Sequence, residues 1–190
     1  FDAWAEAEDV LALEPEVVVV ATGGLATPGR FPGADLAVTA WDVLSGDARP
    51  AGRVLVWDEA GDHAGLQAAQ RLAEEGAEVE VMTPDRTFAP EVMGLNLTPY
   101  LRAMQPLGVR LTVAERLLSL RRDGNGLTAT VGTDYAAQRA ERRYDAVVAN
   151  AGTVPLDELY LALKPLSRNR GAVDHEALAE GRAQPEGRHD

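Results

Sequence analysis

The stretch Val54–Leu72 reads VLVWDEAGDHAGLQAAQRL and decides the expected fold. Its apolar start predicts a buried strand, its polar middle a tight turn, and its apolar residues at three- and four-residue spacing a helix. In nucleotide-binding α/β proteins such a turn carries G-x-G-x-x-G, whose glycines let the backbone approach a pyrophosphate at the helix N-terminus. With Gly65 as the third glycine, the first falls on Ala60 and the second on Asp62. The turn therefore keeps its setting but loses two of the three glycines.

Two interpretations of this turn stay open. In the first, backbone N–H groups and the helix dipole hold a nucleotide phosphate, and Gly61 and Gly65 leave room for a shifted phosphate. In the second, Asp62 is the N-cap of the helix, and its carboxylate takes the N–H groups that a phosphate would need. Because the two anions compete for the same donors, we favour the N-cap. Gly61, Asp62 and Gly65 are the candidate cofactor contacts here.

The end of the next strand provides a second check. A carboxylate that binds ribose is expected about 20 residues beyond the first glycine, and the matching position is Thr83. A threonine cannot accept two hydroxyl hydrogen bonds as a carboxylate does. Asp85 could instead reach back, and Arg86 could accept the 2′-phosphate of NADP; the alternative is a solvated loop. Both departures from the fingerprint point away from a working dinucleotide site.

The rest of the chain fits an α/β domain with one antiparallel insertion. Strands are expected at 17–21, 53–57, 79–82, 108–112 and 145–149, helices at 40–44, 63–75 and 95–106, and antiparallel strands at 114–121, 126–132 and 138–143. The first of these strands is predicted to be a buried parallel strand, because it is a continuous β-branched run. Gly76 is expected to end the helix at 63–75, whose apolar face is Leu66, Ala69, Leu72 and Ala73. Asp123–Gly126 is a hairpin turn signal.

Composition excludes several classes of function. The net charge of −12 over 190 residues argues against nucleic acid and anionic membranes as partners, and no apolar run approaches the roughly 20 residues of a membrane span. The absence of cysteine removes disulfides, thiolate metal ligands and iron–sulfur clusters from this segment. The chain starts at Phe1 and shows no export signal, so we expect a cytoplasmic location and a piece of a longer protein.

The order of elements resembles the NAD(P)-type Rossmann-like domain of two-dinucleotide flavoproteins of the glutathione-reductase type, with its three-stranded antiparallel meander. The turn at Ala21–Gly24 is similar to the exit from the FAD-type domain of that superfamily, and the stretch Val147–Pro155 is similar to the return. This resemblance implies three parts: a flanking FAD-like segment and linker at 1–52, a degenerate NAD(P)-binding-like domain at 53–150, and a truncated return segment at 151–190.

Three stretches resemble a narrower group: Val38–Leu44, Asp58–His63 and Asp157–Tyr160. They are similar to the C-terminal region of the trimethylamine dehydrogenase and 2,4-dienoyl-CoA reductase group of NADH:flavin oxidoreductases, nearest to N-methylproline or betaine demethylase-like members. The resemblance implies a parent with an FMN barrel, a [4Fe-4S] cluster and a neighbouring domain that holds FAD, ADP or nothing. The partners it implies are the rest of the chain and an electron-transfer protein; oligomeric state and substrate stay open.

The resemblance also implies contacts at the two exits, by Thr22, Gly23 and Gly24 and by Ala151 and Gly152. They would line the junction with the neighbouring domain, beside an adenine nucleotide or flavin; the alternative is tight turns without a ligand.

Arg139, Arg142 and Arg143 form a basic strand that is either a docking patch for an acidic electron carrier or a solvated face. We assign no catalytic residue in this chain, and His63 in particular receives no catalytic role.

Three functions follow. The first is a structural or adenine-nucleotide-binding domain of a flavin-dependent amine or N-methyl betaine oxidoreductase. The second is a working NADPH domain of a dienoyl-CoA reductase-like enzyme that uses Arg86. The third is a non-catalytic interaction module.

Overall fold

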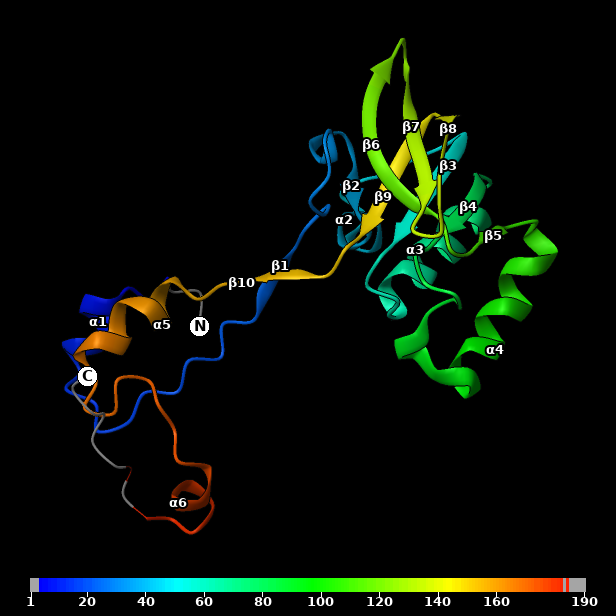
Figure 1. Ribbon diagram of the computed structural model, residues 1–190. Helices are drawn as coiled ribbons and strands as arrows, with labels where there is room; N and C mark the ends of the chain where they lie inside the picture. Colours follow the sequence, from blue (N-terminus) through cyan, green and yellow to red (C-terminus); the bar gives the residue numbers. More distant parts are fainter. Residues whose placement is uncertain (1–3, 183, 185–190) are drawn as a thin grey trace. The chain divides into compact units, whose positions relative to one another are not determined.

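The computed structural model describes residues 4–182 and 184, and the chain divides into two units. One unit is Ala26–Val154 and the other combines Phe1–Leu25 with Pro155–Asp190. The larger unit holds the five-stranded parallel sheet (Figure 1).

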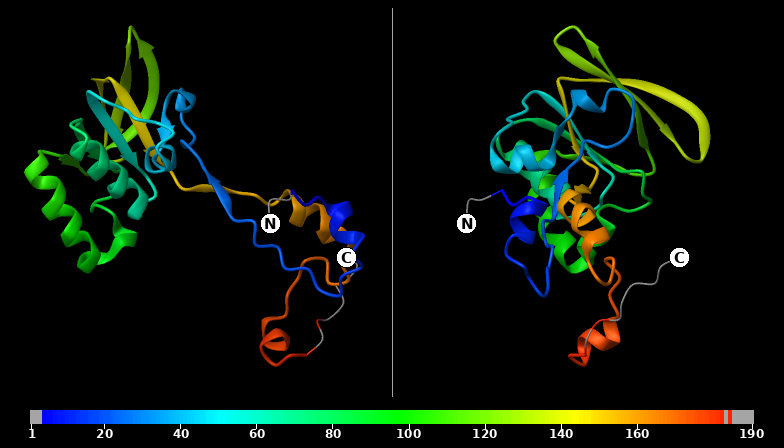
Figure 2. Two further views of the ribbon diagram at one scale, coloured as in Figure 1. Left: turned by 180° about the vertical axis from the view of Figure 1, so that it is seen from behind. Right: turned by 90° about the vertical axis from the view of Figure 1, so that its left-hand side faces the viewer.

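The larger unit is an α/β domain with two sheets. Its helices and strands are β2 (Val38–Thr39), α2 (Ala40–Ser45), β3 (Arg53–Asp58), α3 (His63–Glu74), β4 (Glu78–Met82), α4 (Met93–Met104), β5 (Arg110–Thr112), β6 (Arg116–Asp123), β7 (Gly126–Thr133), β8 (Ala136–Tyr144) and β9 (Ala146–Asn150). Short 3₁₀ turns are η1 (Ala34–Leu36), η2 (Pro90–Val92) and η3 (Gln105–Leu107). The five-stranded sheet has the order β2-β9-β3-β4-β5 with all pairs parallel, and β6-β7-β8 form an antiparallel sheet (Figure 2).

The remaining elements are short. They are α1 (Ala7–Leu11), β1 (Gly24–Ala26), β10 (Thr153–Pro155), α5 (Glu158–Leu163), η4 (Lys164–Leu166) and α6 (His175–Ala179), with β1 paired to β10. Among the described residues, no helix has the length and apolar character needed to cross a membrane.

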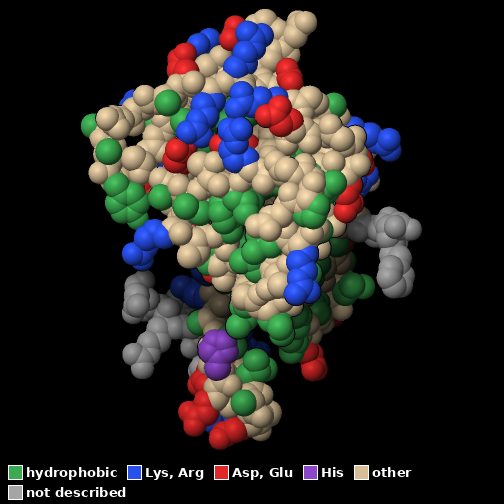
Figure 3. Space-filling view, turned by 90° about the vertical axis from the view of Figure 1, so that its right-hand side faces the viewer, with side chains coloured by type: hydrophobic (Ala, Val, Ile, Leu, Met, Phe, Trp, Pro, Cys, Tyr) green, Lys and Arg blue, Asp and Glu red, His purple; other side chains and the backbone are tan. Residues whose placement is uncertain are grey.

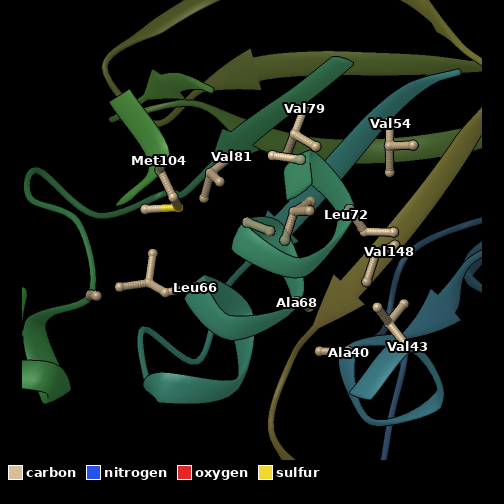
Figure 4. Close-up of a cluster of buried hydrophobic side chains, with 14 of the residues drawn as sticks. Ala40, Val43, Val54, Leu66, Ala68, Leu72, Val79, Val81, Met104 and Val148 are labelled. Carbon is tan, nitrogen blue, oxygen red and sulfur yellow. The ribbon is translucent and has the colours of Figure 1, made fainter. Parts of the chain in front are cut away.

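Two apolar clusters cover the two faces of the parallel sheet. Successive side chains of a strand point to opposite faces, so Val54 and Val56 of β3 enter one cluster while Leu55 and Trp57 enter the other. The first cluster contains the apolar face of α3, with Leu66 and its neighbours directed at the strands (Figure 4). The second packs β6 and β7 against the opposite face. The central strand β3 is therefore buried on both sides, and its carboxyl end is held in place.

The predicted strand–helix–strand order is confirmed. The strand at 53–57 extends to Asp58, the helix at 63–75 ends at Glu74, and Gly76 follows with φ +94° as a left-handed residue past the cap. All four residues of the predicted apolar face are buried. The three antiparallel strands and the hairpin turn are confirmed as well, with Asp123 opposite Gly126. β2 was not predicted.

The predicted strand at 17–21 is wrong. Residues 17–23 have no regular structure, and Val17 and Val19 are 77% and 84% exposed. A parallel strand needs neighbouring strands and a covered face, and no described residue pairs with this run. A β-branched run predicts a buried strand only where the chain supplies those partners.

Candidate functional site

The candidate site lies where β3 and β9 end side by side. The two strands are parallel neighbours, and their last residues, Asp58 and Asn150, are register partners. Both are buried, at 0% and 5% exposure. The chain then turns through residues 59–62 into α3. The carboxyl edge of a parallel sheet is where α/β proteins bind their ligands.

Asn150 holds the turn with its backbone and its side chain. Its carbonyl accepts hydrogen bonds from the N–H groups of Glu59 and Ala60, both at 2.9 Å. Its side-chain Nδ2 donates to Oδ1 of Asp58 and to Oδ1 of Asp62, both at 2.8 Å. One residue of β9 thus fixes both ends of the turn.

Asp58 is a buried carboxylate with one oxygen satisfied. Its Oδ1 also accepts from the N–H of Gly61 at 3.0 Å, whereas Oδ2 is buried without a hydrogen-bond partner among the described residues. Burial raises the pKa of Asp58 from 3.8 to about 6, the hydrogen bonds from Asn150 and Gly61 oppose the rise, and the charges of Asp62 and Asp85 add to it. The turn is therefore lined by acidic groups that disfavour a second anion.

Asp62 is the N-cap of α3, as the sequence predicted. It has extended backbone angles, and its Oδ1 accepts from the N–H of Ala64 at 2.9 Å. The carboxylate therefore takes a donor that a phosphate at the helix N-terminus would use. The Asp62 carboxylate thus occupies the position at the N-terminus of α3 where a bound anion would otherwise lie.

The two remaining glycines of the turn are both tightly packed. A Cβ on Gly65 would lie 2.7 Å from Cγ of Asp58 and 3.0 Å from Nδ2 of Asn150. A Cβ on Gly61 would lie 2.7 Å from Cδ of Pro90, and Gly61 has φ +66°. Both glycines serve close packing of the protein against itself, which explains their presence without a ligand.

Of the residues expected at the ribose position, Asp85 acts on Asp58 through its charge, whereas Thr83 and Arg86 make no hydrogen bond or ion pair with residues 58–65 in the described part of the chain. Thr83 is fully buried; its N–H donates to the carbonyl of Thr112, and its hydroxyl accepts from the N–H of Asp85. Arg86 is exposed, and within the described part of the chain its guanidinium has no hydrogen-bond or ion-pair partner. The hydrogen bonds of Thr83 therefore join the end of β4 to β5 and to the following loop, while Arg86 makes no hydrogen bond to the turn among the described residues.

The candidate contacts at the two exits lie in turns. Thr22 donates its hydroxyl to the carbonyl of Leu156, and Gly23 has φ +68° with open space where a Cβ would lie. Gly152 has φ +84° with similar open space, follows the half-buried Ala151, and accepts from the N–H of Thr27. Gly24 begins β1. Gly23 and Gly152 serve left-handed backbone, and neither needs a ligand to explain it.

The basic strand is largely paired. Arg142 donates to Glu80 at 3.1 Å and to Glu115 at 2.9 Å, and Arg143 lies 3.4 Å from Asp123. Arg139 is exposed. Figure 3 shows Lys and Arg side chains gathered in the upper part of one face, with acidic side chains among them. Two of the three arginines, Arg142 and Arg143, are therefore paired with acidic side chains of the same unit.

Beneath that surface, Glu80 is 4% exposed and accepts from the hydroxyls of Tyr144 and Thr112. Burial, and then the charge of Glu80, raise the pKa of Tyr144 to about 12. This network links β4 to β5 and to β8.

Sequence reasoning missed Asp58 and Asn150 as partners. The available signal was that each is the first polar residue after a buried apolar run, on strands expected to be parallel. Strand order decides whether such residues meet, and the order was not predicted.

The chain is similar to known proteins over nearly all its length. It is 53% identical over 185 residues to a probable N-methylproline demethylase of Rhizobium meliloti strain 1021, which is 97% of this chain and 27% of that protein. It is 37% identical over 189 residues to an N,N-dimethylglycine/sarcosine dehydrogenase of Chromohalobacter salexigens, again 27% of that protein. The chain thus spans about a quarter of the length of these curated relatives. No protein-family model matches it.

A solved structure has the same fold. The 6-hydroxypseudooxynicotine amine oxidase of Pseudomonas geniculata N1 superposes with a TM-score of 0.74 at 27% identity, over 89% of this chain and 26% of that one.

Proposed function

We propose that the chain is the NAD(P)-like domain of a flavin-dependent amine or N-methyl oxidoreductase. Its relatives support this, because the chain belongs, as a segment, to the trimethylamine dehydrogenase-like flavin oxidoreductases. In this domain the turn at residues 59–62, where a dinucleotide phosphate would bind, is closed. Residues 53–150 are that Rossmann-like domain, of the glutathione-reductase type. Residues 1–52 and 151–190 flank it as segments of an FAD-like domain. In this proposal the domain is structural, and dinucleotide reduction is not its task.

One observation carries the proposal: the protein's own acceptors take the N–H groups of the turn. Asn150, Asp58 and Asp62 together accept from four backbone N–H groups between residues 59 and 64. A pyrophosphate would have to displace a buried carboxylate and the N-cap, against their charge. The residues present therefore do not fit a dinucleotide at this turn.

The reaction itself is proposed for the longer protein. An FMN barrel would oxidise the amine, and a [4Fe-4S] cluster would have to be held elsewhere because this chain has no cysteine. FAD or ADP would belong to the neighbouring FAD-like domain. The partners would be the rest of that protein and an electron acceptor.

A calorimetric titration of the purified protein with NADH, NADPH and ADP tests the closed turn. We expect no binding below millimolar concentration by the unmodified protein. Asp62→Gly should bind ADP at least about tenfold more tightly, because it removes a carboxylate that competes for the N–H groups and repels the phosphate. A tenfold change requires only about 1.4 kcal/mol. Asp35→Gly, at an exposed aspartate, is the control and should bind like the unmodified protein. Micromolar binding of a dinucleotide by the unmodified protein would contradict the proposal.

A second candidate function rests on Arg86. Its exposure and its lack of a partner among the described residues favour an NADPH contact. If that function is correct, Arg86→Ala weakens NADPH binding and leaves NADH unchanged, while Asp62→Gly has little effect. The same titration therefore separates the two functions.

A further inference from the structure

A segment packed over the turn has no place in the function so far. The first residues of η2 lie against Gly61: the N–H of Glu91 donates to its carbonyl at 3.1 Å, and a Cβ on Gly61 would touch Pro90. Ala89 and Val92, on either side, are buried at 2% and 1% exposure. The segment therefore packs directly against Gly61, a residue of the turn.

The backbone on both sides of η2 is strained. Ala89 has φ +43° and ψ +59°, and Met93 has φ +63° and ψ +150°, although neither is glycine. The second conformation is one that essentially only glycine adopts at ease. Non-glycine residues hold such angles only where surrounding contacts enforce them. Backbone strain is therefore concentrated at the two ends of η2.

The helix that follows is anchored at its far end by Met104 and along its length by the half-buried Leu97 and Tyr100, which pack against the first apolar cluster. Of the twelve residues of α4, only Met104 at its far end is buried, whereas α3 buries six of its twelve. Met93 and Leu95, at the near end, are 73% and 89% exposed. The near end of α4 therefore makes few buried contacts, and such a segment opens locally at a small free-energy cost.

One polar contact joins α4 to the start of α3. The Tyr100 hydroxyl lies 3.0 Å from Nδ1 of His63, and the two rings are 5.9 Å apart. His63 is the first helical residue after the turn. This contact therefore ties α4 to the first helical residue after the turn.

We propose that η2 and α4 together form a lid over the turn, held shut by the contact between Tyr100 and His63. The lid opens at Met93 and Ala89, whose strain is released in the open state. This proposal rests on the proposed function in one respect only, namely that the lid excludes a phosphate group from the N-terminus of α3. Two features then close the turn: the carboxylates that accept its N–H groups, and the lid that packs against Gly61.

Hydrogen exchange measured by mass spectrometry tests the lid without any nucleotide. Tyr100→Phe should speed exchange in peptides that cover residues 59–65 and 89–93 by about three- to tenfold, the effect of losing one hydrogen bond, and leave β6–β8 unchanged. Tyr135→Phe, at a tyrosine that is 70% exposed, is the control and should change neither. Unchanged exchange at the turn in Tyr100→Phe, or acceleration spread over all peptides, would contradict the proposed lid.

A second pair of variants tests the strain in the opposite direction. Met93→Gly should slow exchange at the same peptides by about threefold or more, because glycine adopts the closed backbone without strain. Leu95→Gly, in the same helix turn but with no positive φ, should speed exchange because it adds only flexibility. Equal effects of the two glycines would contradict the proposal. The titration with ADP stands apart, so a failed lid and a failed closed turn are distinguishable.

Discussion

The free energy of unfolding is expected to fall by about 2 kcal/mol as the pH rises from 4 to 7, through the ionisation of Asp58 alone. Burial raises the pKa of this carboxyl from 3.8 to about 6 in the folded protein, and a tenfold change in its proton affinity corresponds to about 1.4 kcal/mol. Between these values the folded protein binds a proton that the unfolded chain does not, so folding is favoured at the acidic end. The contribution is fully present below pH 3.8 and is lost as the pH rises through 6.

Urea unfolding of the unmodified protein and of Asp58→Asn at several pH values checks this expectation. The amide does not ionise, so the variant should lack this component, and the difference between the two proteins should change by about 2 kcal/mol across the range. Asp35→Asn, at an exposed aspartate, should follow the unmodified protein. Parallel stability curves for Asp58→Asn and the unmodified protein would show that burial does not penalise the charged form of Asp58.

Gly65→Ala is expected to destabilise the protein by about 2–3 kcal/mol, although alanine is the better helix former. Its Cβ would lie 2.7 Å from Cγ and 2.8 Å from Oδ1 of Asp58, inside a fully buried contact. Gly94→Ala is the matched control, because Gly94 lies in α4 with nothing within 4 Å of the added Cβ. We expect that control to be neutral or to stabilise by about 0.5–1 kcal/mol.

A double-mutant cycle identifies what the alanine collides with. In an Asp58→Ala background the nearest atoms are gone, so Gly65→Ala should be less costly there by about 1 kcal/mol or more. Thermal or urea unfolding of the four proteins gives the coupling. If Gly65→Ala has the same effect in both backgrounds, the close approach of α3 to Asp58 is not the reason for the glycine.

Local patterns predicted the elements of the larger unit because each element carries its own signal. The apolar run at 53–57 and the spacing of Leu66 and Leu72 depend only on neighbours within one strand or one helix turn. The run at 17–21 carries an equally strong strand signal, yet it is exposed because no described strand pairs with it. A pattern states what a segment can do, and its partners decide whether it does so.

The site was only half predictable for the same reason. The N-cap role of Asp62 is local, and it is confirmed. The contact of Asn150 with Asp58 depends on β9 lying beside β3, which no local pattern specifies. The covering segment depends on positive φ at Ala89 and Met93, residue types that give no sign of it.

The hydrogen bond between Asn150 and Asp58 spans 92 residues, and this separation has a kinetic consequence. A chain that emerges from the ribosome from its N-terminus can form β3, α3 and β4 long before β9 exists. During that interval the turn lacks both the carbonyl and the amide of Asn150, and its N–H groups remain bound to water. The last strand of the sheet therefore also closes the turn, so closure should be a late folding event that follows the slow, long-range pairing of β9.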